Sequence, residues 1–151
     1  MSLVEEVDLL RGIPLFEKME ASKLKLLAIS SDRVNFRPGA VLMRQGDDAD
    51  AAYVIISGKG DVVIDTPSGE IKVAEVNSGQ IVGEVAILID VPRTATVKTE
   101  EGLTALKIGK ENFLRLLTGS PQVAVEIIKV LASRLENTTA QLREAVSTKN
   151  A

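Results

Sequence analysis

A glycine, a carboxylate and an arginine lie close together between positions 81 and 97, in the stretch IVGEVAILIDVPRTATV. Gly83 lets the backbone approach a ligand, and the amides that follow it can open a short helix whose N-terminus favours an anion. The guanidinium of Arg93 can grip two phosphate oxygens at once, which a lysine cannot do. These groups predict a site for an anion that also carries a hydroxyl, such as a phosphate on a ribose.

Each of the three residues also has a simpler interpretation. Gly83 can be a turn glycine, Arg93 a surface arginine paired with Asp90, and Glu84 a first-turn acid that suits the helix dipole. The distance from Gly83 to Arg93 favours a binding site over a turn glycine, whereas for Arg93 and Glu84 the residues alone leave both interpretations open. A carboxylate beside a phosphate repels it unless the carboxylate meets a donor, so we expect Glu84 to accept a hydrogen bond from the ribose 2′-hydroxyl.

The run GEVAI, then five residues, then RTATV resembles the phosphate-binding cassette of cyclic nucleotide-binding domains. Glycine turns typical of that family occur upstream, at Pro38-Gly39, Gln45-Gly46-Asp47, Ser57-Gly58-Lys59-Gly60 and Ser78-Gly79-Gln80. The resemblance extends from Leu9 to Leu142. It implies that cAMP or cGMP is bound as a ligand, with no further cofactor and no metal. The ligand-binding residues it implies are Gly83, Glu84, Val85, Ala86, Arg93, Thr94, Ala95, Val62, Val73, Thr138 and Thr139.

Several of these positions bear on the purine base. Val62, Val73 and the neighbouring Ala74 match family positions that border the purine, although such residues are also ordinary core. Thr94 matches a position where a hydroxyl can reach the ligand, and it leaves the choice between adenine and guanine open. Val82 and Ile87 depart from the family pattern, which predicts altered packing behind the cassette.

The C-terminal stretch carries a second resemblance. Ser120-Pro121 predicts the start of a long helix reaching about Val146, with a seam at three- and four-residue spacing: Ile128, Leu131, Leu135, Thr138, Leu142 and Ala145. Residues 133–139 resemble the dimer helix of the bacterial catabolite activator family. This resemblance implies a homodimer in which Thr138 meets the base of its own protomer and Thr139 that of the partner. A register-setting Thr138 without a ligand role is the alternative.

The elements that must position these residues form one predicted domain over 1–151: N-terminal helices within 4–30, a β-roll over 32–108 with the cassette at 82–96, and C-terminal helices over 110–147. Short β-rich runs broken every eight to twelve residues predict a roll or sandwich rather than a βαβ sheet. The expected strands are Asp32–Phe36, Ala40–Arg44, Ala52–Ser57, Gly60–Thr66, Ile71–Val76, Thr94–Thr99 and Thr104–Ile108. The fold class is therefore α+β and mainly β, a jelly-roll-like double-stranded β-helix flanked by helices.

Composition narrows the function classes. The 151 residues contain no cysteine and no histidine, so the chain cannot perform Ser-His-Asp or Cys-His catalysis and has no thiolate zinc site. The net charge of −3 offers no surface for direct nucleic-acid binding. No apolar run is long enough to span a membrane. We expect a cytoplasmic protein that is not an enzyme.

Three functions remain to compare. The first is a regulatory module that binds a cyclic nucleotide and signals through its long helix; it could be the effector domain of a transcription factor whose DNA-binding domain is not part of this chain. The second is a dimerisation scaffold of the same fold that binds no nucleotide. The third, an enzyme with a cupin-like roll, is disfavoured because such sites use metal-binding histidines.

Overall fold

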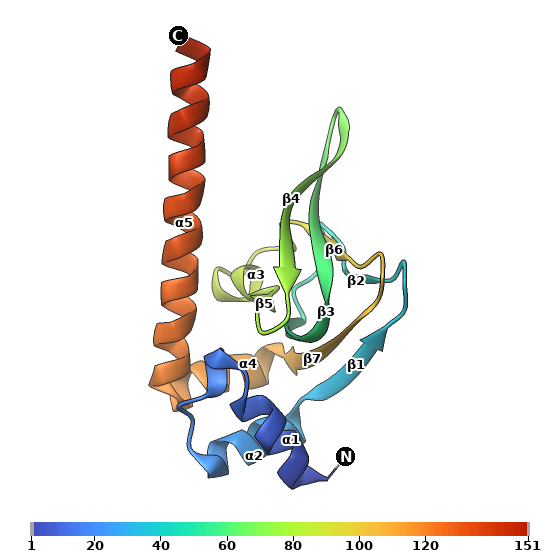
Figure 1. Ribbon diagram of the computed structural model, residues 1–151, viewed down its shortest axis with the longest axis vertical. Coiled ribbons are helices and arrows are strands. Elements are labelled where there is room, and N and C mark those ends of the chain that lie inside the picture. The colour runs from blue at the N-terminus through green and yellow to red at the C-terminus, as the bar shows by residue number, and fades with distance from the viewer. Residues whose placement is uncertain (1, 151) are drawn as a thin grey trace.

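A computed structural model describes residues 2–150, so Met1 and Ala151, the two ends of the expected domain, lie outside the described residues. Helices from both ends of the chain lie below and along one side of a curled antiparallel sheet, as Figure 1 shows. The elements are α1 (Leu3–Arg11), η1 (Pro14–Phe16), α2 (Ala21–Ser30), β1 (Asp32–Phe36), β2 (Val41–Met43), β3 (Ala51–Thr66), β4 (Gly69–Asn77), β5 (Ile81–Val82), α3 (Glu84–Leu88), β6 (Thr96–Lys98), β7 (Leu103–Gly109), α4 (Lys110–Gly119) and α5 (Pro121–Asn150). The fold class predicted from the sequence, a β-roll flanked by helices, is confirmed.

Strand β3 belongs to both halves of the roll. Its first half pairs with β5 and β7, and its second half pairs with β4 and β6, all antiparallel. The sequence predicted two strands here, and that prediction is wrong because Gly58 bends the chain without ending the strand. Gly58 has φ +83°, and the register shifts between Ile55 and Ser57. A bulge of this kind re-aims a strand while its pairing continues.

Alternation along β3 builds two cores from one strand, since successive side chains point to opposite faces. Ala52 and Val54 face the helices and belong to a cluster with Phe16, Leu24 and Phe113. The residues that alternate with them, Ala51, Tyr53 and Ile55, point into the roll and pack with Leu42, Val97 and Ala105. The helices thus pack on one outer face of the roll, and a separate, mainly aliphatic core that includes Tyr53 fills its inside.

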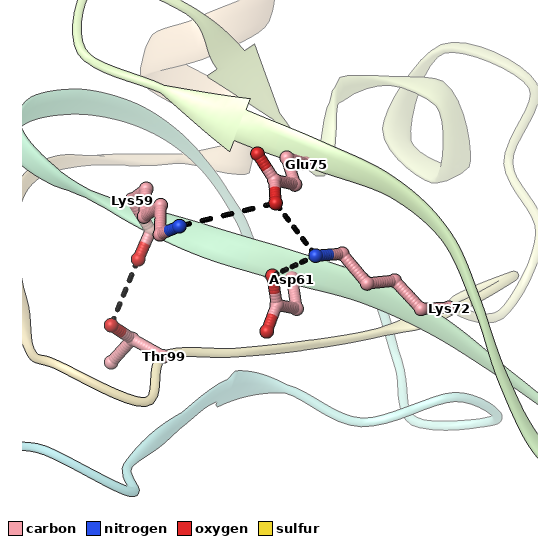
Figure 2. Close-up of polar contacts among 5 residues, drawn as sticks. All are labelled: Lys59, Asp61, Lys72, Glu75 and Thr99. Atoms are coloured by element: carbon pink, nitrogen blue, oxygen red, sulfur yellow. Dashed lines mark hydrogen bonds and ion pairs between the residues drawn. The ribbon is translucent and has the colours of Figure 1, made fainter.

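The β3–β4 hairpin turns at Pro67-Ser68, where the sequence places a turn signal. At its base, Lys72 Nζ lies 2.6 Å from Glu75 Oε1 and 3.1 Å from Asp61 Oδ1, and Lys59 Nζ lies 4.0 Å from Glu75 Oε1 (Figure 2). Hydrogen bonds to Glu75 and Asp61 raise the pKa of Lys72. Surface pairs of this kind add little stability. Two of them, Lys59–Glu75 and Lys72–Asp61, link β3 to β4.

Helix α5 begins at Pro121, as predicted, and extends well beyond the other helices alongside the hairpin (Figure 1). Its base is anchored, because Val123 and Ile127 are buried in the helical core and Leu131 packs against it. Further along, Leu135 and Leu142 are 68% and 64% exposed. Within residues 2–150, no helix is both long enough and apolar enough to cross a membrane.

Candidate functional site

The cassette is built as a short loop around one left-handed glycine. Strand β5 ends at Val82, and Gly83 adopts φ 87° and ψ 1° as the N-cap of α3. A Cβ atom on Gly83 would lie 2.8 Å from both Arg93 NH1 and Met43 Cε. Glycine is therefore required twice over, by the backbone angle and by the space. The first-turn amides of α3 have no acceptor within the helix, so they are the groups that can face an anion.

Arg93 is buried at 4% exposure, and it ties the two ends of the cassette together. NH1 donates to Gly83 O at 2.8 Å, and NH2 donates to Ala51 O at 2.5 Å. NH2 also lies 3.2 Å from Asp50 Oδ1, on a carboxylate that is 69% exposed. The guanidinium is thus held in place by backbone carbonyls, with an acidic side chain as its solvent-facing partner.

The simpler interpretation of Arg93 as a surface partner of Asp90 is wrong. Asp90 pairs with Lys110 Nζ at 3.5 Å, and Arg93 pairs with Asp50.

The pKa of Tyr53, inside the roll, depends on both Asp50 and Arg93. Burial raises the pKa of Tyr53, the charge of Asp50 raises it further, and the charge of Arg93 lowers it.

Glu84 is almost completely buried, at 1% exposure, yet it carries an ionisable group. Arg134 of α5 resolves this, because its NH1 donates to Glu84 Oε1 at 2.6 Å and its NH2 donates to Ile81 O at 3.0 Å. Among the described residues, no buried side-chain nitrogen or oxygen lacks a hydrogen-bond partner. A buried carboxylate is tolerated when it is paired in this way. The contact joins the long helix directly to the cassette.

One cavity of about 200 Å³ brings most of the predicted site residues together. Its walls include eight of them: Val62, Gly83, Glu84, Val85, Ala86, Arg93, Thr94 and Ala95. Ala74, Glu75 and Val76 of β4 also line the cavity, and Glu75 forms the ion pairs with Lys59 and Lys72 that Figure 2 shows. The cavity is therefore lined by the polar groups of the cassette and by hairpin side chains, of which Val62, Ala74 and Val76 are apolar.

Three predicted residues do not line this cavity. Val73 is 52% exposed, and it sits where the β3–β4 register shifts, since Val62 pairs with Ala74 and Val63 with Lys72. Thr138 is exposed and Thr139 is half-buried on the part of α5 beyond Arg134. The roles of all three at the base stay predictions, and that of Thr139 depends on a second protomer.

Sequence reasoning missed Arg134 and Asp50. Arg134 lies within the 133–139 stretch that resembles a dimer helix, four residues before Thr138 and so on a neighbouring helical position. That spacing could have predicted Arg134 as a site residue. No sequence pattern predicts Asp50, because it precedes β3 by one residue and lies 43 positions from Arg93 in the chain.

Comparison with known proteins identifies the family to which the chain belongs. The cyclic nucleotide-binding domain family matches residues 33–120, and the chain belongs to this family. The cAMP-dependent protein kinase regulatory subunit of Dictyostelium discoideum is 34% identical over 117 residues, covering 75% of this chain and 34% of that subunit. The resemblance stated from the cassette is confirmed at the level of the family.

Two bacterial regulators share the architecture. The sensor domain of the transcriptional regulator DNR from Pseudomonas aeruginosa has a TM-score of 0.77 at 28% identity, covering 91% of this chain and 93% of that one. The catabolite activator protein of Thermus thermophilus has a TM-score of 0.75 at 28% identity, covering 85% of this chain and 61% of that one. Among kinase regulatory subunits, the chain spans about a third of the relative or less, at 34% and 27% of two of them.

Proposed function

We propose that this domain binds cAMP or cGMP and passes the occupancy of its site to α5. The observation that carries the proposal is the convergence of Gly83, Glu84 and Arg93 on one cavity, with Arg134 of α5 on the same carboxylate. Family membership supports the ligand class. Residues 83–86 and Arg93 would hold the cyclic phosphate, and Thr94 and Ala95 would border it.

Binding of the phosphate is an exchange of anions at Arg93. Asp50 is mostly exposed, so its carboxylate can turn into solvent when a phosphate approaches NH2. The bonds from Arg93 to Gly83 O and Ala51 O are compatible with this exchange, because a guanidinium has five N–H donors. A charge-assisted bond of this kind contributes roughly 1.5–3 kcal/mol.

The ribose provides the link to the helix. We assign Glu84 Oε2 as the acceptor for the 2′-hydroxyl, while Oε1 accepts from Arg134. A ligand that changes the surroundings of Glu84 changes the strength of the Glu84–Arg134 pair, and so favours one position of α5 over another. A ligand shifts such an equilibrium only by its difference in affinity for the two states.

The base and the partner complete the proposal. Val62 would border the purine, and Val73 would approach it if the hairpin closes over the ligand. Thr138 would meet the base bound by its own protomer, and Thr139 would meet the partner's base in a homodimer formed through α5. Thr94 leaves the choice between cAMP and cGMP open. Within a longer protein, the output could be that of a transcription factor or of a kinase regulatory subunit.

Calorimetry with cAMP and cGMP, together with melting curves, tests the proposal. Ligand at a hundred times its dissociation constant should raise stability by about 2.7 kcal/mol. Arg93→Lys serves as the control, because it keeps the charge but loses the two-pronged grip, and it should bind either nucleotide more weakly. If millimolar concentrations of both nucleotides leave the wild-type melting temperature unchanged, the proposal fails.

A nucleotide-free dimerisation scaffold is the second candidate. The observation in its favour is that Arg93 and Glu84 already have partners within the chain, in Asp50 and Arg134. It predicts a dimer whose mass and melting temperature do not respond to either nucleotide. The same calorimetry distinguishes the two.

A further inference from the structure

A second cavity is lined by residues of α2 and α4. These two helices lie at the base of the molecule, away from the cassette (Figure 1). Its volume is about 310 Å³, and it shares no lining residue with the nucleotide cavity. Met19 and Leu27, at 3% and 4% exposure, contribute to its buried wall, and Leu116 packs beside them. Leu26 stands at the rim with 66% of its surface exposed. Pockets of this size and apolar character are typical of small-molecule sites.

Hydrogen bonds between the two helices close the cavity at both ends. At one end, Lys23 Nζ of α2 donates to Gly119 O at the end of α4. At the other end, Asn112 Nδ2 of α4 donates to Ser30 O at 3.1 Å. Lys23 and Ser30 are seven residues apart, which places the closures about 10 Å from each other along α2. That length fits a medium alkyl chain, whereas a partner helix laid along the groove would meet both closures.

The charged groups of the cavity have one sign. Its two ionisable lining residues are Lys23 and Arg115, and no acid is among the lining residues. Arg115 NH1 donates to Asn112 Oδ1 at 3.2 Å, which holds the guanidinium at the polar rim. The chain as a whole is net negative, at −3, so this positive charge is local. A guanidinium over an apolar floor is suited to an anion with an apolar tail.

We propose that the α2–α4 cavity binds a medium-chain fatty carboxylate. Its alkyl chain lies between the two closures against Met19 and Leu27, and its carboxylate is held by Arg115 at the end closed by Asn112. No residue of the nucleotide site takes part, so this site is independent of the proposed function.

Methionine methyl NMR tests this with a reporter in each cavity, because Met19 lines the α2–α4 cavity and Met43 lines the nucleotide cavity. Decanoate should shift the Met19 methyl resonance in a saturable manner, with a dissociation constant at or below about 1 mM. The Met43 resonance should stay in place. Decanol, which has the same chain without the charge, should bind roughly tenfold more weakly, which corresponds to about 1.4 kcal/mol.

Arg115→Gln is the matched variant, because Arg115 is exposed and belongs to neither buried cluster. It should make decanoate as weak as decanol and leave the Met43 resonance unchanged. The proposal is overturned if Met19 does not respond to decanoate, if both methyl groups shift without saturation, or if the variant binds decanoate as tightly as the wild type. A Met19 shift caused only by an acidic amphipathic peptide, or only by raising the protein concentration, would assign the cavity to a partner helix or a second copy instead.

Discussion

A methyl group on Gly83 would meet Arg93 NH1 and Met43 Cε, each at 2.8 Å. Gly83→Ala should therefore combine two costs. The left-handed backbone costs about 1–2 kcal/mol for a residue with a Cβ, and overpacking adds typically about 1–3 kcal/mol. Because Arg93 must move, nucleotide binding should be lost as well. Chemical denaturation and calorimetry measure the two effects.

Gly39→Ala is the control for that variant. Gly39 has φ +86°, almost the same as Gly83 at +87°, but a Cβ built there meets nothing within 4 Å. It should show the backbone cost alone and keep nucleotide binding. Equal losses of stability in the two variants, with binding retained in both, would contradict the assignment of Gly83 to the site.

Tyr53 offers a second test at the residue scale, because it is the only tyrosine in the chain and there is no tryptophan. Burial raises its pKa above the ordinary value near 10, Asp50 adds to this, and Arg93 opposes it. The folded state therefore holds the phenol proton more tightly than the unfolded state. This contribution to stability is complete below the unfolded pKa and is lost as the pH rises through the folded pKa.

Ultraviolet titration should accordingly follow Tyr53 alone. Asp50→Asn should lower its pKa, and bound nucleotide should raise it, because the phosphate offsets the charge of Arg93. Asp50→Asn should also bind nucleotide several-fold more tightly, since it removes the anion that competes for Arg93. A Tyr53 titration that is indifferent to saturating nucleotide would argue against phosphate at Arg93.

At the scale of the elements, the Arg134–Glu84 pair links α5 to the cassette, and its coupling energy can be measured. Arg134→Gln leaves Glu84 buried at 1% exposure without its cation. Removing one partner of a buried pair costs about 3 kcal/mol or more, although the half-exposed Arg134 places this variant at the lower end. Glu84→Gln should lose less, and the double variant should recover part of the loss of Arg134→Gln. Urea denaturation of all four proteins gives the coupling energy.

The same substitution at Arg143 controls for helix propensity, because Arg143 lies on the exposed C-terminal half of α5. It should change stability by no more than a few tenths of a kcal/mol, as is usual for exposed positions. If Arg134→Gln behaves like Arg143→Gln, then α5 is not coupled to the cassette through Glu84.

These elements also show what sequence alone can predict. Strand β1, the hairpin turn and the start of α5 follow from local signals, namely β-rich runs, Pro-Ser-Gly and Ser-Pro. The continuity of β3 through Gly58 does not follow from local signals, because the glycines at positions 58 and 60 can either bend a strand or end it. Arg93 and Glu84 were predicted as site residues, but their partners Asp50 and Arg134 lie 43 and 50 positions away in the chain. Such long-range pairs are fixed by the closure of the roll.

At the scale of the whole molecule, three parts are in contact around Glu84. Glu84 itself begins α3 of the cassette, and Arg134 of α5 donates both to its carboxylate and to Ile81 O in β5 of the roll. The base of α5 is buried in the helical core, so in the proposed signalling mechanism Arg134 would pass a change at Glu84 to a helix that is anchored at one end. The outer half of α5 is exposed, with Leu135, Leu142 and Val146 on one side at 68%, 64% and 49% exposure. A soluble helix rarely leaves such a stripe uncovered, so we expect a partner on it.

The proposed homodimer can be dissociated at that stripe. Leu135→Lys with Leu142→Lys should convert a dimer into a monomer in light scattering, because paired coiled-coil positions do not accept facing charges. Neither leucine belongs to the buried clusters of the described residues, so the β-roll should remain folded. Ala140→Lys, at an exposed position on the opposite side of the same helix, should stay dimeric. If Thr139 reaches the partner's base, the monomeric variant should also bind nucleotide roughly tenfold more weakly, which is about 1.4 kcal/mol. A monomer with unchanged affinity would remove Thr139 from the site, and a wild-type protein that is monomeric at all concentrations would remove the dimer itself.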